Sequence, residues 1–170
     1  MIIIIRGVVM ANIGIIAEYN PFHNGHKYLM DEVSILSGEE NNYIALMSGN
    51  FLQRGTPAMS DKYTRAESAV IGGIDIAFEF PVIYATGSAK DFAEGAVLML
   101  SRLGAIDNIA FGVEDMEEDL FYEIAEILAN EPAEYKKYLN DYMSKGASYP
   151  TASERAIRSI LGNRIKETIS

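Results

Sequence analysis

Short apolar runs alternate with longer amphipathic segments over the first two thirds of the chain. The apolar runs have the length of buried strands, and the segments between them carry apolar residues at helical spacing. The pattern predicts strands at 13–17, 42–47, 74–80 and 108–111, and helices at 25–36, 61–71 and 88–103. Strands separated by helices of this length favour a parallel sheet with right-handed crossovers, and therefore an α/β fold.

The pattern changes after Val113, where an acidic stretch leads into helices with charges of alternating sign. These helices are expected at 116–130, 132–145 and 151–161. We therefore expect two parts, an α/β core at 1–113 and a C-terminal helical appendage at 114–170. Residues 1–9 form a candidate upstream extension, because Met10 stands directly before Ala-Asn-Ile-Gly-Ile-Ile and is a candidate start residue.

Composition indicates a globular protein. The chain has 170 residues, of which 49% are apolar, and this is enough for one domain with a proper core. Cysteine is absent from the sequence, which excludes disulfides and thiolate metal sites and favours a cytoplasmic location. The apolar N-terminus is interrupted by Arg6 and is too short to span a bilayer, so no membrane association is expected.

Acidic residues outnumber basic ones in both parts of the chain. The formal net charge is −10 at pH 7. Residues 1–113 carry seven Lys and Arg against twelve Asp and Glu, and residues 114–170 carry the same numbers. Structured nucleic acid is normally bound by a basic surface. Any RNA binding by this chain is therefore expected to be weak.

Both histidines of the sequence lie in one turn between the first predicted strand and helix. His23 and His26 flank Asn24-Gly25, directly after Asn20-Pro21 ends the strand. A helix N-terminus offers free N–H groups and the positive end of the helix dipole to an anion. Gly25 permits close approach of phosphate to the backbone, and both imidazoles can donate to phosphate oxygens. The turn is therefore a candidate nucleotide-phosphate site.

Other interpretations of this turn are weaker. An ordinary strand-to-helix connection would have Asn24 as N-cap and both histidines on the surface. A zinc site would have only the two histidines and Glu18 as ligands, so no metal site is predicted. A Ser-His-Asp triad would need a nucleophile elbow of the Gly-x-Ser-x-Gly type, which we do not find.

A second polar loop is expected after the second strand, at 48–60. It contains two glycines and Arg54, a cation that can clamp phosphate or carboxylate, but it is not a phosphate-binding loop of the Gly-Lys-Ser/Thr type. Lys62 and Arg65 follow, one turn apart on one helix face. They either reach a ligand or form a solvated helix start that pairs with nearby carboxylates.

These loops should meet, because ligands of open parallel sheets bind beyond the carboxyl ends of the strands. The loops expected at this edge are 18–26, 48–60, 81–88 and 112–114. In them, Tyr84 either stacks on a base or packs in the core. Gly112 would let an adenine or ribose lie close to the backbone, and a purely structural glycine is the alternative.

Several of these motifs occur together in one known family. They are Glu18–His26, Met47–Gly55, Asp61–Glu67, Glu79-Phe80-Pro81 with Tyr84-Ala85, Phe111-Gly112 and Ser148-Tyr149-Pro150. In this order and spacing they resemble the tRNA(Met) cytidine acetate ligases over about residues 11–155. The resemblance implies a Rossmann-like parallel sheet of the HUP nucleotidyltransferase type, followed by helices.

The resemblance also implies a two-step reaction. Acetate attacks the α-phosphorus of ATP, which usually brings Mg²⁺ with it, to give acetyl-adenylate and pyrophosphate. The N4 amine of the wobble cytidine in elongator tRNA(Met) then accepts the acetyl group. His23, His26, Lys62 and Arg65 are the expected catalytic residues.

The expected ligand contacts follow from the same resemblance. ATP would be bound by Ala17, Glu18, Tyr19, Asn20, Pro21, Phe22, His23, Asn24, Gly25, His26 and Gly112. Acetate, phosphate or tRNA would contact Ser48, Gly49, Asn50, Gln53 and Arg54. The separate roles of Arg54, Lys62 and Arg65 stay open.

The chain departs from the family at its C-terminus. Family members are longer and carry an Asn-Asn-Ile-Leu-Gly-type stretch, a later arginine and a further domain, and none of these is expected here. Activity could therefore need a missing partner segment or a homo-oligomer. The alternatives are a small-molecule adenylyltransferase and a truncated, non-catalytic nucleotide-binding domain.

Overall fold

The computed structural model describes residues 11–38, 40–113 and 118–165. The chain divides between Gly112 and Val113 into two compact units, which are described separately. The candidate extension at 1–9 and the start of the first appendage helix predicted at 116–130 lie outside the described residues.

The first unit contains a parallel four-stranded sheet in the order β3-β2-β1-β4. The strands are β1 (Asn12–Ala17), β2 (Asn42–Ser48), β3 (Ile76–Phe80) and β4 (Asn108–Ala110). The helices are α1 (Asn24–Ser37), α2 (Lys62–Ile71), α3 (Val82–Ala85) and α4 (Ala89–Arg102). The predicted α/β class with a parallel sheet is confirmed, whereas the short helix α3 replaces part of a predicted loop.

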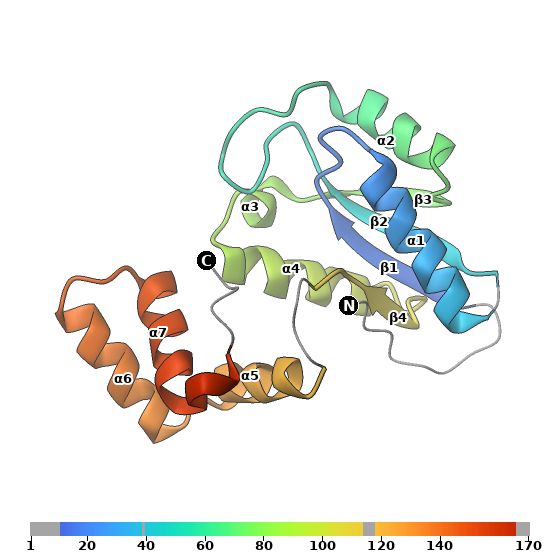
Figure 1. Ribbon diagram of the computed structural model, residues 1–170. Helices are drawn as coiled ribbons and strands as arrows, with labels where there is room; N and C mark the ends of the chain where they lie inside the picture. Colours follow the sequence, from blue (N-terminus) through green and yellow to red (C-terminus); the bar gives the residue numbers. More distant parts are fainter. Residues whose placement is uncertain (1–10, 39, 114–117, 166–170) are drawn as a thin grey trace. The chain divides into compact units, whose positions relative to one another are not determined.

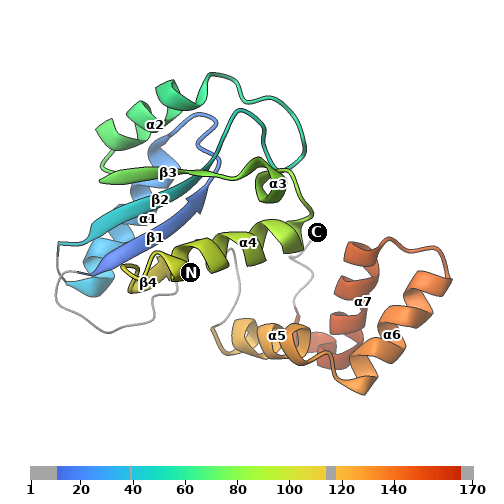
Figure 2. The ribbon, with the colours of Figure 1, turned by 180° about the vertical axis from the view of Figure 1, so that it is seen from behind.

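Helices cover both faces of this sheet. Helices α1 and α2 lie on one face and α4 lies on the other (Figure 1), and the reverse view shows α1 passing behind the strands (Figure 2). Met30, Val33 and Ala69 from α1 and α2 pack on β1 and β2. On the opposite face, Ala96 and Leu100 of α4 pack with Leu46 of β2 and Phe80 of β3.

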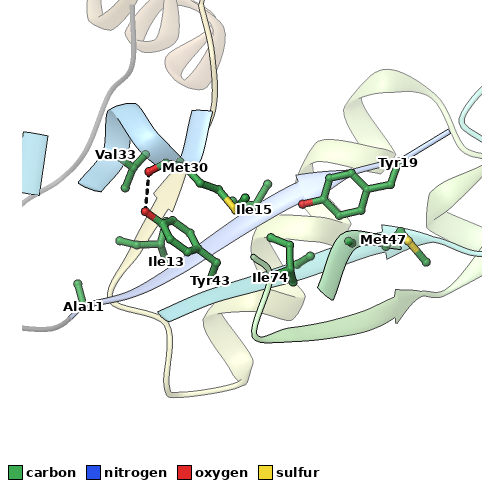
Figure 3. Close-up of a cluster of buried hydrophobic side chains, with 12 residues drawn as sticks. Ala11, Ile13, Ile15, Tyr19, Met30, Val33, Tyr43, Met47 and Ile74 are labelled. Carbon is green, nitrogen blue, oxygen red and sulfur yellow. Dashed lines mark hydrogen bonds between the residues drawn. The ribbon is translucent and has the colours of Figure 1, made fainter. Parts of the chain in front are cut away.

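The larger core cluster extends from the amino ends of the strands to the beginning of the candidate site. Tyr43 of β2 donates through its hydroxyl to the Met30 carbonyl oxygen, over 2.7 Å, and so joins the sheet to α1 (Figure 3). Tyr19, directly beyond β1, belongs to the same cluster and is 1% exposed. The turn after β1 is therefore anchored in the core.

The helix boundaries follow local capping chemistry. Asp61 caps α2, because its carboxylate accepts from the N–H groups of Tyr63 and Thr64, each over 3.0 Å. The N-cap of α1 is His23, not Asn24. The predicted third strand began at Ile74, but β3 begins at Ile76, and Ile74 is a buried residue of the preceding turn.

The second unit is helical, with α5 (Glu118–Asn130), α6 (Ala133–Ser144), α7 (Tyr149–Leu161) and the short 3-10 helix η1 (Gly162–Arg164). Its core contains Leu120, Tyr135, Leu139, Ala152, Ala156, Ile157, Leu161 and Ile165. The Tyr135 hydroxyl lies 2.8 Å from the Ser153 hydroxyl, so this buried polar pair is satisfied. No helix among the described residues is long and apolar enough to cross a membrane.

Candidate nucleotide-binding site

The turn between β1 and α1 rests on aromatic side chains. Tyr19 has a φ of 45°, which residues other than glycine rarely adopt, and its side chain is buried. The ring of Tyr19 lies 4.8 Å from that of His26, edge to face, and 5.2 Å from that of Phe22. Burial also raises the pKa of the Tyr19 phenol, so it stays neutral. The contact with the Tyr19 ring helps to fix the orientation of the His26 ring.

The two histidines form a reciprocal capping box at the beginning of α1. Nδ1 of His23 accepts from the Gly25 N–H, and Nδ1 of His26 accepts from the His23 N–H, each over 3.1 Å. A neutral imidazole whose Nδ1 accepts carries its proton on Nε2. The rings stack with their centroids 3.8 Å apart. The arrangement therefore leaves an Nε2–H donor on each of two stacked rings at a helix N-terminus, where an anion is favoured.

The protonation of His26 is set by its surroundings. Burial and, to a smaller extent, the neighbouring charge of His23 together lower its pKa from 6.5 to about 4. His26 is therefore neutral at pH 7 and can keep Nδ1 as an acceptor. A bound phosphate would act in the opposite direction, because an adjacent anion favours the imidazolium form.

We expect the His26 ring proton to titrate near pH 4 in the free protein, and at a clearly higher pH once ATP is bound. The unfolded chain binds this proton near pH 6.5, so between pH 6.5 and 4 the unfolded state holds more protons than the folded state. Stability should therefore fall as the pH drops through this window. NMR titration of the two histidines, assigned with His23→Asn, checks both statements. Titration of His26 near pH 6.5 in the free protein would contradict them.

Side chains of the turn also contact the second loop. The Glu18 carboxylate accepts from the Gln53 N–H over 2.8 Å, and the Asn20 side-chain oxygen accepts from the Met59 N–H over 2.7 Å. Both residues were expected to contact ATP. In this structure their side chains hold residues 50–59, while the backbone of the turn remains the part that could face a nucleotide.

Arg65 is buried among backbone carbonyl oxygens. Its side chain is 1% exposed, and its guanidinium donates to the carbonyl oxygens of Glu18 over 2.6 Å, Ser60 over 3.2 Å and Ser48 over 3.1 Å. It also donates to the Gly49 carbonyl oxygen. These four hydrogen bonds join Arg65 to backbone at the ends of β1 and β2 and just before α2, and its catalytic role stays a prediction.

Lys62 lies nearer to solvent and pairs with Glu79, which occurs in one of the family motifs but was not among the predicted site residues. Its ammonium lies 2.6 Å from the carboxylate of Glu79, at the carboxyl end of β3, and this hydrogen bond raises the pKa of Lys62. The alternative pairing of Lys62 with carboxylates of its own helix is not observed. The sequence signal that could have identified Glu79 as a site residue is its position next to the last residue of a predicted strand.

The remaining predicted residues of the second loop differ in exposure. Arg54 and Asn50 are exposed, and Gln53 is partly buried. Ser48 is fully buried, and its hydroxyl has no hydrogen-bond partner in the described part of the chain. Gly49 is in close contact with the side chain of Glu79, because a Cβ at Gly49 would meet a carboxylate oxygen of Glu79 at 2.5 Å.

Gly112 lies in an open position beyond β4. A Cβ built there would meet none of the described atoms within 4 Å, so packing does not require a glycine. Open space of this kind is compatible with the predicted approach of a nucleotide.

Tyr84 packs on α4, where a Cβ at Gly95 would meet its side chain at 2.6 Å. No group of three His, Asp or Glu side chains that could hold a metal occurs among the described residues.

Comparisons with known proteins agree with this geometry. Residues 10–169 match the family model described as HIGH Nucleotidyl Transferase. A tRNA(Met) cytidine acetate ligase of Syntrophomonas wolfei is 47% identical over 158 residues, which make up 93% of this chain and 38% of that protein. Its counterpart from Clostridium novyi is 46% identical over 144 residues, 85% of this chain and 36% of that protein.

The solved structures include a close match. Thermotoga maritima TmcAL, crystallised with alpha-thio ATP, superposes with a TM-score of 0.83 at 41% identity, covering 91% of this chain and 37% of that one. This chain therefore spans less than two fifths of the length of these relatives. The family model covers nearly the whole chain and the solved relative has the same fold, so the resemblance drawn from the motifs is confirmed. The chain belongs to the HIGH nucleotidyltransferase family.

Proposed function

We propose that this chain binds ATP through the turn at 18–26 and uses it to activate acetate. The α- to γ-phosphates would lie at the N-terminus of α1, against the Nε2–H groups of His23 and His26 and the backbone at Gly25. Gly112 would lie beside the nucleoside. The reciprocal histidine capping box is the observation that carries this proposal, because it occupies both Nδ1 atoms and so leaves an Nε2–H donor on each ring for a ligand.

The activation step is a displacement at phosphorus. A carboxylate oxygen of acetate forms a bond to the α-phosphorus as the bond to pyrophosphate breaks, which gives acetyl-adenylate. Negative charge accumulates on the phosphoryl oxygens during this step, and neutral, preoriented N–H donors can stabilise it. Mg²⁺ would arrive with ATP and bind mainly to its phosphates. Acetate and the leaving pyrophosphate would contact the second loop at Ser48, Gly49, Asn50, Gln53 and Arg54.

The relatives are named for a cytidine of tRNA(Met), and the acceptor proposed for the transfer step is the one that the motif resemblance implies. The N4 amine of the wobble cytidine in elongator tRNA(Met) attacks the acetyl carbon, AMP leaves, and the amine loses a proton. Lys62 lies at the carboxyl edge of the sheet and is the candidate to contact the reacting groups. Because the chain has a net charge of −10, its own contribution to tRNA affinity should be small and strongly salt-dependent.

Acetate-dependent exchange of radioactive pyrophosphate into ATP tests the activation step without tRNA. We expect exchange with acetate and Mg²⁺, and little exchange when acetate is replaced by a phosphorylated metabolite. ATP binding measured by calorimetry on the same sample provides the control. Binding without exchange would reduce the proposal to a non-catalytic nucleotide-binding domain, and exchange that requires a different acceptor would indicate a small-molecule adenylyltransferase. Absence of binding would refute the proposal as a whole.

A further inference from the structure

Two segments far apart in sequence are held together by polar contacts at the carboxyl edge of the sheet. The turn after β1 supplies the side-chain acceptors of Glu18 and Asn20. The second loop supplies the N–H groups of Gln53 and Met59, which donate to them over 2.8 and 2.7 Å. Arg65 adds a third link through the Glu18 carbonyl oxygen. Each acceptor therefore satisfies a backbone donor that the second loop does not satisfy internally.

The second loop is a small hairpin. The Leu52 N–H donates to the Thr56 carbonyl oxygen over 2.9 Å, and the Ala58 N–H donates to the Asn50 carbonyl oxygen over 3.0 Å. Its tip has Gly55 with a φ of 72°. We call residues 50–59 the second hairpin.

Few apolar contacts hold the second hairpin in place. Leu52 is its only large apolar side chain among the described residues that is buried, whereas Phe51 is 47% exposed and Met59 is 79% exposed. Segments with little buried apolar surface open at low free-energy cost. The position of the hairpin therefore depends strongly on its polar contacts with the turn.

We propose that the second hairpin is docked on the nucleotide turn by Glu18 and Asn20, and that this docking is coupled to nucleotide binding. Glu18 and Asn20 are then positioning residues, which act through the hairpin. The inference rests on the proposed function, since it takes ATP as the ligand of the turn. The proposal gives a specific role to two side chains for which the family resemblance implied direct contact with ATP.

The coupling has a simple physical origin. The backbone conformation of the turn that places Gly25 and the histidines for phosphate also aims Glu18 and Asn20 at the hairpin. A nucleotide that orders the turn therefore lowers the entropic cost of docking the hairpin. Binding linkage is reciprocal. The factor by which ATP favours docking of the hairpin is therefore the factor by which loss of docking weakens ATP binding.

Docking also has a chemical consequence. Asn50 and Arg54 belong to the hairpin and are candidates for contact with acetate or pyrophosphate. Their distance from the phosphate site is set by where the hairpin lies. Nucleotide binding would thus assemble the second half of the reaction site, which is the kind of positioning that accelerates a two-substrate reaction.

Trypsin cleavage after Arg54 reports on docking, because this exposed residue lies next to Gly55 at the hairpin tip. Cleavage at this bond, identified by mass spectrometry, should slow about fivefold or more when Mg·ATP saturates the turn, the lower range of typical coupling. Hydrogen exchange at the Gln53 and Met59 amides should slow in parallel. Both measurements use the intact chain.

Glu18→Ala and Glu18→Gln separate positioning from charge. Alanine removes the acceptor, so the free protein should be cleaved faster after Arg54 and should bind ATP about fivefold or more weakly. Glutamine keeps an acceptor oxygen without the negative charge, so both values should stay near those of the wild type, or ATP should bind more tightly. Glu94→Gln, in an exposed pair with Lys90 on α4, is the matched control and should change neither value.

The outcomes are distinguishable. ATP binding that leaves cleavage after Arg54 unchanged would overturn the coupling while the proposed function stands. Tighter ATP binding by Glu18→Ala would also overturn it, because that is the result expected if Glu18 acts on the phosphates only through its charge. Absence of ATP binding by the wild-type chain would overturn the proposed function, and the coupling with it.

Discussion

Replacing His23 and His26 together with alanine should abolish measurable ATP binding. Each Nε2–H would lose a hydrogen bond to a charged phosphate, worth about 1.5–3 kcal/mol. The pair would lose about 3–6 kcal/mol, which weakens binding by a factor on the order of 10² to 10⁴. Calorimetry with Mg·ATP on the wild type and the double variant measures this directly. Unchanged affinity in a folded double variant would rule out the proposed site.

The double variant also removes the capping box of α1, so a second variant is needed to separate the two effects. His23→Asn retains a favoured N-cap whose side-chain oxygen can accept the Gly25 N–H, but it lacks the distal Nε2–H donor. We expect its melting temperature to stay near that of the wild type, while ATP binds on the order of 10-fold more weakly. Equal losses of stability and affinity would instead indicate that His23 acts only as a cap.

The elements of this fold could be predicted from local pattern because each one is specified by nearby residues. The strand before the histidines is an apolar run closed by Asn20-Pro21, and α2 begins where Asp61 offers its carboxylate to the next turn. The His-x-Gly-His turn was likewise placed by its immediate neighbours. Consequently the α/β class and the location of the candidate site were both accessible before the structure.

The directions of polar side chains were less accessible, because they depend on contacts between distant segments. Glu18 and Asn20 contact residues 53 and 59, and Lys62 at the beginning of α2 pairs with Glu79 of β3. Helical spacing cannot report any of these pairings. His23 was missed as N-cap for a related reason: asparagine is the commoner cap, and the reciprocal contact with His26 favours histidine here.

Arg65 is another polar side chain whose direction could not be predicted from the sequence. Its buried contacts lead to the prediction of a large loss of stability. A lone arginine on a helix face is ordinarily a solvated charge, yet here it is buried among backbone carbonyl oxygens. Burial lowers the pKa of its guanidinium, an effect opposed by the charges of Asp61 and Glu18 and by that of Glu79. Its fork of donors joins the ends of two strands and the beginning of α2, a geometry that few other side chains can reproduce.

Arg65→Ala should therefore destabilise the first unit by about 3 kcal/mol or more, since each buried acceptor left unpaired costs about 1–3 kcal/mol. Arg65→Lys should lie between alanine and the wild type, because an ammonium cannot reach all of these carbonyl oxygens at once. Urea unfolding followed by circular dichroism measures both. Arg102→Ala, at an exposed position in the last turn of α4, is the control and should stay within about 0.5 kcal/mol of the wild type.

The lysine variant also distinguishes the buried role of Arg65 from the catalytic contact expected from the sequence. Under conditions where Arg65→Lys is fully folded, a structural role predicts that ATP affinity and acetate-dependent exchange remain close to those of the wild type. A direct contact with the reacting phosphates predicts that exchange falls while the melting temperature hardly changes. A large loss of acetate-dependent exchange in a folded variant would therefore indicate that Arg65 contacts the reacting groups. A loss of stability alone would show that Arg65 acts by joining the two loops through their backbone carbonyl oxygens.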